Sequence, residues 1–560
     1  MSTKVRKLFL IVPTLVLMFL VSWPYWHSQM PSTHDGQNHL ARFANYKLAL
    51  RQGQFPPRFA PNLMNNYGYP VFNYNYPLAN ILSLPFSIIK VNPEWSFRWL
   101  LWLSFIVGAV GVWQWGKQMG WSRNWSFIGI LFLASAPPLL NIILVRGNIG
   151  EWMALLFLPW LCWWIELCKK SEEPTWQQTS IAAIVHLAFL LSHNVTVLIT
   201  APVLFILTLT AFGKSWSKWR AWIMPGIWAC FASFWFWLPA LLEKDLVAVT
   251  QGNLSSQYVQ HFPRLKQLLF APLQFGYSYP GPVDSLSFSL GAAQWLVLFI
   301  GIGLVVAQLR VRKRLPRWGV YGLVALMLVF LQTSSSQEIW KRTPAANLLQ
   351  FPWRLSLWWV IVIVPVGVSV LKAVPKIGQI ILMAVILLQL TVPILYQPRS
   401  RFHQLNADYD HFSQSTTTSN ENRPIGFSYE NIGDWKAAPS ILVGSGEVNA
   451  KSWNGTERQY NLELPLASIV TEPTMAFAGW ETYIKEKETG KEFKIPYIDN
   501  EVIQGRLAYQ LPAGKYEVHS RFTQHTAARQ VGNGLSFLTV IAGLMWLLLT
   551  LYHQRGNERS

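Results

Sequence analysis

The stretch "LFLIVPTLVLMFLVSWPYW" (residues 8–26) decides the class of the chain, because it is an almost unbroken apolar run behind a basic start. A membrane-spanning helix needs about 20 mostly apolar residues, and this run is close to that length. Lys4, Arg6 and Lys7 precede the run, and no small-residue cleavage site follows it. We therefore expect an uncleaved signal anchor rather than a signal peptide that is removed.

The composition of the 560 residues agrees with this, since 51% of them are hydrophobic and only 13% are charged. Soluble proteins carry about 25% charged residues. The net charge of +19 would suit a nucleic-acid partner, but the basic residues lie mostly in short clusters between apolar runs, where they orient helices. The three cysteines all lie within apolar runs, which argues against a disulfide framework. The sequence thus predicts a polytopic α-helical membrane protein with no nucleic-acid partner.

Similar runs along the chain predict about twelve spans in all. They lie near residues 8–26, 97–116, 125–144, 151–168, 178–193, 195–212, 221–241, 288–309, 318–332, 353–371, 377–396 and 534–552. With the N-terminus inside, most basic clusters of the connecting segments fall on the cytoplasmic side, as the positive-inside rule requires. The apolar segment 77–90 is about 14 residues long, too short to cross, so we expect it in the membrane interface. The basic segment 39–55 is predicted to be a second interfacial helix.

This topology divides the chain into three parts. Residues 1–396 form the transmembrane domain, which includes a long outer loop at 27–96. Residues 397–533 form an extracytoplasmic domain, in which alternating stretches such as "QYNLELPLASIV" and turns such as "LPAGKY" predict a small β-sandwich. Residues 534–560 supply the last helix and a tail. We expect a multi-pass protein of the inner (cytoplasmic) membrane with both termini in the cytoplasm.

Ionisable residues in or near spans are costly, so they are candidates for a functional site. Five of them belong to the predicted outer side: Asp35 after the first span, Arg146 and Glu151 at the turn between the third and fourth, His193 between the fifth and sixth, and Arg354 at the start of the tenth. They are far apart in sequence, but the topology brings all of them to one face of the membrane. We therefore predict that they form one site.

The residue types limit the chemistry of this site. Asp35 could act as a general base that deprotonates an acceptor hydroxyl. Glu151 could share a divalent cation, Mg²⁺ or Mn²⁺, with Asp35. Arg146 and Arg354 could bind a phosphate or pyrophosphate leaving group bidentately.

Two histidines complete the predicted site. His193 could be a phosphate ligand or an acid. Of His34 and His39, which flank Asp35, we expect one to contribute, and we assign His39 to substrate binding.

Each candidate also has a purely structural alternative. Glu151 and Arg146 would suit a helix N-terminus at an interface, His193 a helix cap, and Arg354 an interfacial anchor. The aromatic stretch "NNYGYPVFNYNYP" (65–77) could stack on a sugar ring or form an interfacial belt.

In this order, the motifs resemble the GT-C superfamily of membrane glycosyltransferases. The chain is most similar to the bacterial and archaeal membrane family labelled "6-pyruvoyl-tetrahydropterin synthase-related", through "HDGQNHLARF", "YGYPVFNYNYPLA", "VRGNIGEWMAL", "LSHN" and "LLQFPWRLS". Despite the label, the sequence holds no Cys/His zinc cluster that would support pterin chemistry.

The resemblance implies transfer of a hexosyl or pentosyl group from a polyprenyl-phosphate-linked donor to an acceptor on the outer face of the membrane. Asp35 matches the catalytic Asp of the first loop in the superfamily, and Glu151 matches the acid of the second. A single Asp stands where the best-known members have a paired acid motif, which leaves the need for a metal open. The acceptor, a glycan, a lipid or a protein, also stays open.

Two other classes of function remain. A transporter or flippase for a lipid-linked saccharide would carry charged residues near the bilayer midplane and repeated helix sets. A non-catalytic envelope-assembly protein would bind no sugar donor.

Overall fold

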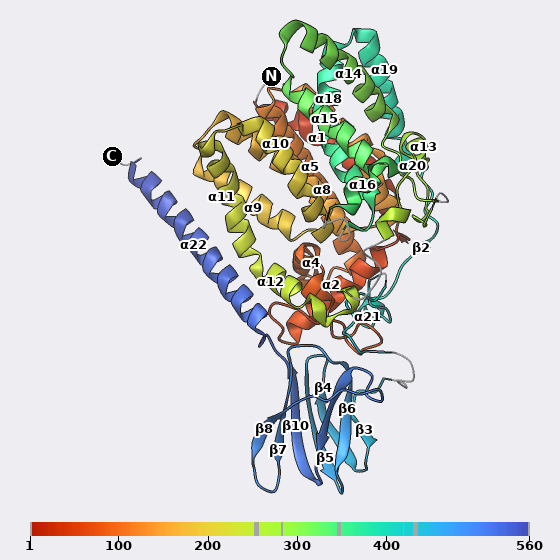
Figure 1. The fold of residues 1–560 in the computed structure, drawn as a ribbon, viewed down its shortest axis with the longest axis vertical. Helices are drawn as coiled ribbons and strands as arrows, with labels where there is room; N and C mark the ends of the chain where they lie inside the picture. The colour runs from red at the N-terminus through yellow and green to blue at the C-terminus, as the bar shows by residue number, and fades with distance from the viewer. Residues whose placement is uncertain are drawn as a thin grey trace. The chain divides into compact units, whose positions relative to one another are not determined.

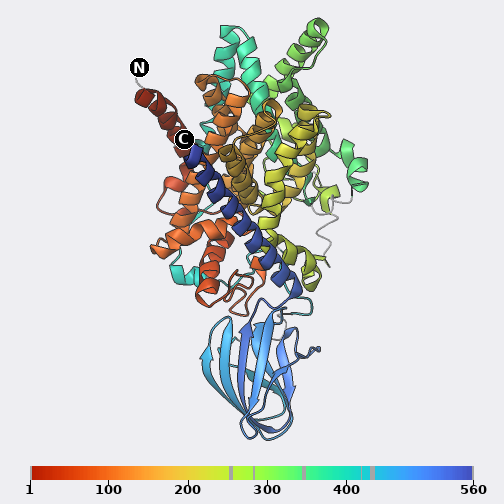
Figure 2. The ribbon, with the colours of Figure 1, turned by 90° about the vertical axis from the view of Figure 1, so that its left-hand side faces the viewer.

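The computed structural model describes residues 3–250, 257–281, 284–343, 349–417, 419–428 and 435–557, whose helices and strands are traced in Figures 1 and 2. The chain divides into two compact units of three segments each. Unit 1 comprises Met1–Gly36, Glu94–Cys230 and Asn253–His403, and unit 2 comprises Gln37–Pro93, Phe231–Gly252 and Gln404–Ser560. The predicted domain boundaries after residues 396 and 533 stay predictions. The two units differ from the predicted domains because each unit combines segments that are distant in sequence.

Unit 1 is built of apolar helices. In chain order, its main helices are α1 (Thr3–Val21), α5 (Pro93–Gln118), α6 (Arg123–Ser135), α7 (Pro137–Asn141), η2 (Ile142–Arg146), α8 (Ile149–Lys170), α9 (Trp176–Leu190), α10 (Asn194–Phe212), α11 (Trp216–Ala232), α14 (Ala292–Arg312), α15 (Arg317–Gln332), η8 (Pro352–Leu355), α18 (Ser356–Ala373), α19 (Lys376–Gln389) and α20 (Val392–Leu395). The first eleven predicted spans all coincide with these helices or with adjoining pairs of them. Helices α8 and α18 carry the most buried side chains, so they form the centre of the unit.

Seven helices of the described residues are long and apolar enough to cross a membrane, and there are up to ten such spans if each of three bent helix pairs counts as one. By length and composition, the chain is therefore a multi-pass membrane protein. The predicted spans 8–26 and 178–193 are helical but fall short of this test. Helix α9 has 15 residues, and the apolar part of α1 whose side chains are described is Ile11–Val21. The count of about twelve stays a prediction.

The bend between α6 and α7 has a cause in the sequence. Pro137 and Pro138 follow Ala136, and a proline both lacks a backbone N–H and restricts the residue before it. The chain turns by 51° there and continues through α7 into η2, a single π-helical turn over Ile142–Arg146. Such turns are frequent at functional sites. Here the turn leads directly into the polar residues that precede α8.

Unit 2 combines short helices of the first loop with antiparallel strands. Its helices include α2 (Gly36–Arg51), α3 (Val71–Tyr74), α4 (Leu78–Ile88), α12 (Phe234–Leu242), α21 (Asn406–Asp410) and α22 (Ala527–Asn557). Its strands are β3 (Ser440–Val443), β4 (Glu447–Trp453), β5 (Glu457–Leu464), β6 (Ser468–Met475), β7 (Trp480–Glu486), β8 (Glu492–Ile495), β9 (Arg506–Leu511) and β10 (Gly514–Phe522). They form a five-stranded sheet of order β4-β5-β10-β7-β8 and a three-stranded sheet of order β3-β6-β9.

The two sheets share one apolar cluster, to which Leu462 and Val518 contribute from the larger sheet and Val470 from the smaller. A buried ion pair also joins them, since Arg458 of β5 donates to Glu472 of β6 at 2.7 Å. The alternation predicted for "QYNLELPL" is present in β5, where exposed and buried residues alternate. The predicted β-rich region before the last helix is confirmed, whereas a sandwich fold in particular stays a prediction.

The aromatic stretch 65–77 belongs to the core of unit 2. Tyr67, Tyr69 and Phe72 are buried in one cluster with Met475 of β6 and other residues. These rings therefore neither line a sugar site nor form an interfacial belt, and both alternatives were wrong for them. Burial explains this, because a run of large apolar rings gains more from packing inside a protein than from solvent exposure.

Helix α2 corresponds to the segment 39–55 that was predicted to lie in the membrane interface. The helix is present, but its apolar residues, such as Leu40, Phe43 and Tyr46, are buried within the protein. The ring of Tyr46 packs edge-on against Phe72 at 5.0 Å. Since these side chains are already covered by protein, they are not available to enter a lipid surface.

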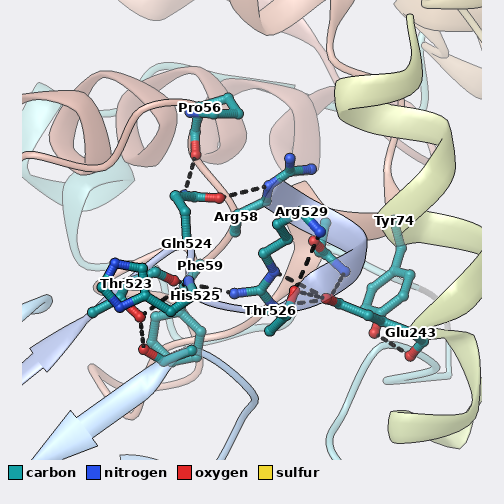
Figure 3. Close-up of polar contacts among 12 residues, drawn as sticks. Pro56, Arg58, Phe59, Tyr74, Glu243, Thr523, Gln524, His525, Thr526 and Arg529 are labelled. Atoms are coloured by element: carbon teal, nitrogen blue, oxygen red, sulfur yellow. Dashed lines mark hydrogen bonds and ion pairs between the residues drawn. The ribbon is translucent and has the colours of Figure 1, made fainter. Parts of the chain in front are cut away.

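A buried ion pair fixes the first turn of α22 to unit 2 (Figure 3). Arg529 Nη2 and Nε donate to Glu243 Oε2 at 2.9 and 3.2 Å. Asn73 Nδ2 donates to the same oxygen at 2.9 Å, and Thr526 Oγ1 donates to Oε1 at 2.5 Å. The carboxylate is thus charge-balanced and hydrogen-bonded, as a buried carboxylate must be.

Arg58 makes a second buried connection to α22. Its Nη2 donates to Asn533 Oδ1 at 3.2 Å and to the carbonyl of Trp235, and its Nε donates to Gln524 Oε1 at 3.3 Å. Burial, and then the nearby Arg529, lower the pKa of Arg58 to about 9, so the group is still charged at neutral pH.

Removing the cation of the buried pair should destabilise unit 2 strongly. Arg529→Met leaves Glu243 buried without its partner, which costs about 3–5 kcal/mol. The matched control is Lys451→Met, which breaks the exposed pair of Lys451 with Glu517 and should cost at most about 1 kcal/mol. Unfolding of the detergent-purified protein by sodium dodecyl sulfate measures both changes. Shifts of equal size would contradict the role given to Arg529.

Candidate functional site

Asp35 lies in a short segment between the strand β1 (Met30–Pro31) and helix α2. The backbone N–H of His34 donates to the carbonyl of Val145 at 3.1 Å, and that of Asp35 donates to the carbonyl of Arg146 at 2.8 Å. These two bonds tie the segment to the end of η2. The structure therefore brings Asp35 next to Arg146, although the two residues belong to different loops.

Asn148 connects Asp35 with helix α8. Its Nδ2 donates to Asp35 Oδ2 at 3.1 Å, and its Oδ1 accepts from the backbone N–H of Glu151 at 2.9 Å. The second bond is the N-terminal cap of α8. Sequence reasoning missed Asn148, although an Asn three residues before a Glu at the start of an apolar run is a recognised cap signal.

Gly147 allows this arrangement because no other residue fits its place. Its φ is +64°, in the left-handed region that favours glycine. A Cβ atom on Gly147 would lie 2.0 Å from Thr33 Oγ1 and 2.7 Å from Thr33 Cβ. Thr33 is itself engaged, since its Oγ1 accepts from the N–H of Gly36 at 3.1 Å. The glycine thus lets the segment of Asp35 approach the turn closely.

Arg146 and Glu151 form a buried ion pair across this turn, from Nη1 to Oε2. Glu151 is fully buried in the first turn of α8, and the guanidinium of Arg146 also lies 5.0 Å from the ring centre of Trp353. The pair is neutral as a whole, so the charge of Arg146 is balanced inside the protein. Burial of a lone carboxylate at this place would be prohibitive.

A small pocket lies against this pair. Its lining includes Asn141, Arg146, Glu151, Gln332, Trp353 and Arg354. Arg146, Glu151 and Arg354 were predicted to converge, and they do so here. Asp35 is not a lining residue, but it is joined to the pocket wall through Asn148.

Three oxygen atoms on the pocket lining have no hydrogen-bond partner among the described residues: Asn141 Oδ1, Glu151 Oε1 and Gln332 Oε1. The orientation of both amides is set by backbone carbonyls, because Asn141 Nδ2 donates to Ser287 O at 2.7 Å and Gln332 Nε2 to Leu328 O at 3.0 Å. A buried acceptor without a donor costs about 1–3 kcal/mol. The pocket therefore favours a ligand or solvent that donates several hydrogen bonds.

Arg354 supplies positive charge to the same pocket from η8. Its Nη1 donates to the carbonyl of Leu349 and to Gln350 Oε1, both at 3.3 Å. Both of these acceptors are neutral groups. Arg354 thus adds a second guanidinium to the lining of the pocket, beside that of Arg146.

The two predicted histidine ligands make other contacts. His193 caps helix α10, with Nδ1 accepting from the backbone N–H of Thr196 at 3.3 Å, as its structural alternative expected. His39 is buried in α2, with its ring 6.1 Å from that of Tyr76. Neither contact concerns the pocket, and the roles of His193 and His39 in substrate binding stay predictions.

His34 supports the segment of Asp35 from the other side. Its ring stacks on Tyr277 at 4.5 Å and meets Phe275 edge-on at 5.1 Å. Burial lowers the pKa of His34 below its usual value of 6.5, and the negative charge of Asp35 opposes this only in part. His34 is therefore neutral at neutral pH, and adds no charge beside Asp35.

Asp35 and Glu151 were the predicted metal ligands. No group of three or more His, Cys, Asp or Glu that could hold a metal occurs in the described part of the chain. One oxygen of each carboxylate is engaged, since Asp35 Oδ2 accepts from Asn148 and Glu151 Oε2 is paired with Arg146. The predicted binding of Mg²⁺ or Mn²⁺ by Asp35 and Glu151 stays a prediction.

Comparison with known proteins gives distant similarities. No family model matches the chain, so the resemblance to the "6-pyruvoyl-tetrahydropterin synthase-related" family is not shown. A protein of Lactococcus lactis subsp. cremoris (strain MG1363), described as an uncharacterized protein, is 25% identical over 201 residues. That match takes in 34% of this chain and 31% of the relative, so the chain spans less than a third of the relative's length.

Three solved structures are similar to the chain at low identity. The arabinofuranosyltransferase AftD from Mycobacteria has a TM-score of 0.43 at 16% identity, over 69% of this chain and 26% of that chain. The oligosaccharyltransferase of Archaeoglobus fulgidus in the apo form has a TM-score of 0.41 at 11% identity, over 74% of this chain and 57% of that chain. ArnT from Cupriavidus metallidurans bound to undecaprenyl phosphate has a TM-score of 0.40 at 14% identity, over 74% of this chain and 69% of that chain. Because these scores are low, the function proposed below rests on the residues of this chain.

The tight fit at Gly147 makes a testable prediction. In Gly147→Ala, the new methyl group clashes with Thr33, and alanine is also unfavourable at a positive φ. The clash should destabilise the protein by about 2 kcal/mol beyond the cost of the positive φ. Gly120→Ala is the matched control, since Gly120 has a φ of +74° but no atom within 4 Å of its Cβ position. Unfolding midpoints of both variants measure the difference, and equal midpoints would rule out the close approach of Thr33.

Proposed function

We propose that the protein is a membrane glycosyltransferase that moves a sugar from a polyprenyl-phosphate-linked donor to an acceptor on the outer face of the cytoplasmic membrane. The observation that carries the proposal is the attachment of Asp35, through Asn148, to a pocket whose lining has unpaired acceptors and the guanidinium of Arg354. The resemblance of the sequence motifs to GT-C enzymes supports the same class.

Asp35 is the proposed general base. It is half-buried, and Asn148 holds its Oδ2, while Oδ1 has no hydrogen-bond partner within the described part of the chain. Oδ1 takes the proton of the acceptor hydroxyl as the acceptor oxygen bonds to the anomeric carbon of the donor sugar. The bond from that carbon to the phosphate oxygen breaks, and the lipid phosphate leaves with the electron pair. General bases of this kind contribute about 10²–10⁴-fold to rates.

The pocket is the proposed place of the donor sugar. Sugar hydroxyls are hydrogen-bond donors, and they would satisfy the unpaired oxygens of Asn141, Glu151 and Gln332. Under this proposal, the acceptors fix the ring and thereby orient the anomeric carbon toward Asp35.

Arg354 is the proposed contact of the leaving phosphate. Its guanidinium can form paired hydrogen bonds with phosphate oxygens and balance the charge that develops on them. Arg146 has a different role, because its charge is already balanced by Glu151. It holds Glu151 in place, and so positions one of the pocket acceptors. No step of this scheme passes through a metal.

Replacing Asp35 tests the proposed base. Asp35→Asn keeps the size and the hydrogen bond but cannot take a proton, so sugar transfer should fall by about 10²-fold or more. Purified protein with radiolabelled polyprenyl-phosphate sugars and membrane extracts as the acceptor source measures transfer. Asp245→Asn, at an exposed carboxylate, is the control and should keep full activity.

Unchanged transfer by Asp35→Asn would remove Asp35 from the mechanism. A flippase would move the labelled lipid across the bilayer without cleaving the sugar–phosphate bond, and an assembly protein would bind no donor. Product analysis of the same reactions thus separates the three classes.

Replacing an unpaired acceptor tests the sugar pocket. Gln332→Leu removes a buried oxygen that lacks a donor, so the free protein should be as stable as the wild type or more stable. The Michaelis constant for the donor should rise about tenfold, because the sugar loses one hydrogen bond.

The control for this change is Gln294→Leu. Gln294 is also fully buried, but its Oε1 accepts from Gln389 at 3.0 Å and its Nε2 donates to Ser135 Oγ at 3.2 Å. This variant should therefore lose stability. Loss of stability in Gln332→Leu with no change of the Michaelis constant would show that the oxygen serves folding and not the donor.

A further inference from the structure

A second pocket lies within unit 2 and is lined by residues of α2, of α21, and of the end of α4 with the turn after it. It contains about 650 Å³ of open space. Lys47 and Arg51 reach it from α2, Lys90 from the turn after α4, and Asn406 and Asp410 from α21. Neither the composition nor the proposed sugar transfer assigns a role to this pocket.

The charge of this pocket is not balanced. Its three cations form no salt bridge with any carboxylate of the described residues, and Asp410 is the single acid of the lining. Three positive charges and one negative charge leave a net charge of +2. Like charges held close together repel, so a pocket of this kind favours an anion that takes up hydrogen bonds.

The pocket walls are held in place by the protein. Asn45, buried on α2, donates from Nδ2 to the carbonyl of Tyr409 at 3.2 Å, which fixes α21 to α2. Lys90 has a φ of +59°, in the left-handed region, and its N–H donates to the carbonyl of Ser87 at 3.2 Å. Glycine is the usual residue at such a helix end, and a lysine in this left-handed conformation costs about 1 kcal/mol of backbone strain.

Helix α4 adds an apolar surface beside the cations. Leu82, Ile88 and Ile89 are 41%, 78% and 70% exposed, whereas Leu78 and Ala79 are buried. The helix is therefore buried at its N-terminal end and exposes apolar side chains toward its C-terminal end. An 11-residue helix is too short to cross a bilayer, and exposed apolar side chains beside cations suit the membrane interface.

We propose that this pocket binds the phosphate headgroup of an anionic membrane phospholipid, with the exposed C-terminal end of α4 among the first carbons of its acyl chains. Arg51 can hold two phosphate oxygens, and Lys47 and Lys90 add point charges. The adjacent Ile88 and Ile89 favour a lipid over free phosphate, because free phosphate would leave them in water. The inference does not depend on the proposed sugar transfer.

Lipid retention tests the inference. The full chain is reconstituted in vesicles of equal parts phosphatidylcholine and phosphatidylglycerol and is then extracted in mild detergent. Native mass spectrometry counts the phosphatidylglycerol molecules that each protein keeps. We expect a triple variant to bind the retained lipid roughly a hundredfold more weakly, because each substitution removes the attraction of one cation for the phosphate. The three substitutions are Lys47→Gln, Arg51→Gln and Lys90→Gln.

The matched control removes three exposed cations elsewhere in unit 2, as Lys487→Gln, Lys491→Gln, Arg521→Gln, and should keep the lipid. Asp410→Asn removes the acid of the pocket and should bind the lipid roughly fivefold more tightly, which tests the site even if the triple variant fails to fold. Equal loss in the control, no change in Asp410→Asn, or full displacement of the lipid by inorganic phosphate would overturn the inference.

Discussion

The candidate site depends on one electrostatic constraint, the burial of the Glu151 carboxylate. A fully buried carboxylate needs a cation close by, and Arg146 supplies it from the last residue of η2. The two partners are five positions apart in the sequence, and between them Gly147 takes a left-handed conformation and Asn148 caps α8. Asp35 takes its position from this turn, through one backbone bond to Arg146 and one side-chain bond from Asn148. Asp35 is thus held by a turn that the buried pair closes.

The hydrophobic pattern predicted most of the helices, because long apolar runs have few alternatives in a chain of this kind. It could not distinguish residues that face lipid from residues that face protein, since both are apolar. For this reason α2 was assigned to the interface, and an interfacial belt was one of two alternatives for the aromatic stretch 65–77. The apolar side chains of α2 and the rings of Tyr67, Tyr69 and Phe72 are instead buried in unit 2. The bend at Pro137 and the π-helical turn after it need knowledge of the packing as well as the sequence.

For the site, charged residues were easy to single out, and Arg146, Glu151 and Arg354 do meet at one pocket. The amides were missed because Asn and Gln carry no charge and are common in loops. Asn148, Asn141 and Gln332 acquire their importance only from partners that are distant in sequence or lacking altogether. The sequence also suggested a site rich in positive charge. The structure instead gives the pocket near Asp35 a balanced pair and unpaired acceptors, whereas the least balanced group of cations described above belongs to unit 2.

The ion pair of Arg529 and Glu243 has a consequence for the biogenesis of the protein. Its partners are 286 residues apart, and the bond from Arg58 to Asn533 joins positions 475 residues apart. A ribosome delivers the chain from its N-terminus, so Arg58 and Glu243 enter the membrane region long before α22 exists. Until then, each is a charge without its native partner. Unit 2 therefore cannot close during translation of the first segments, and a nascent chain that stalls before α22 would expose a charged defect that quality-control proteases can recognise.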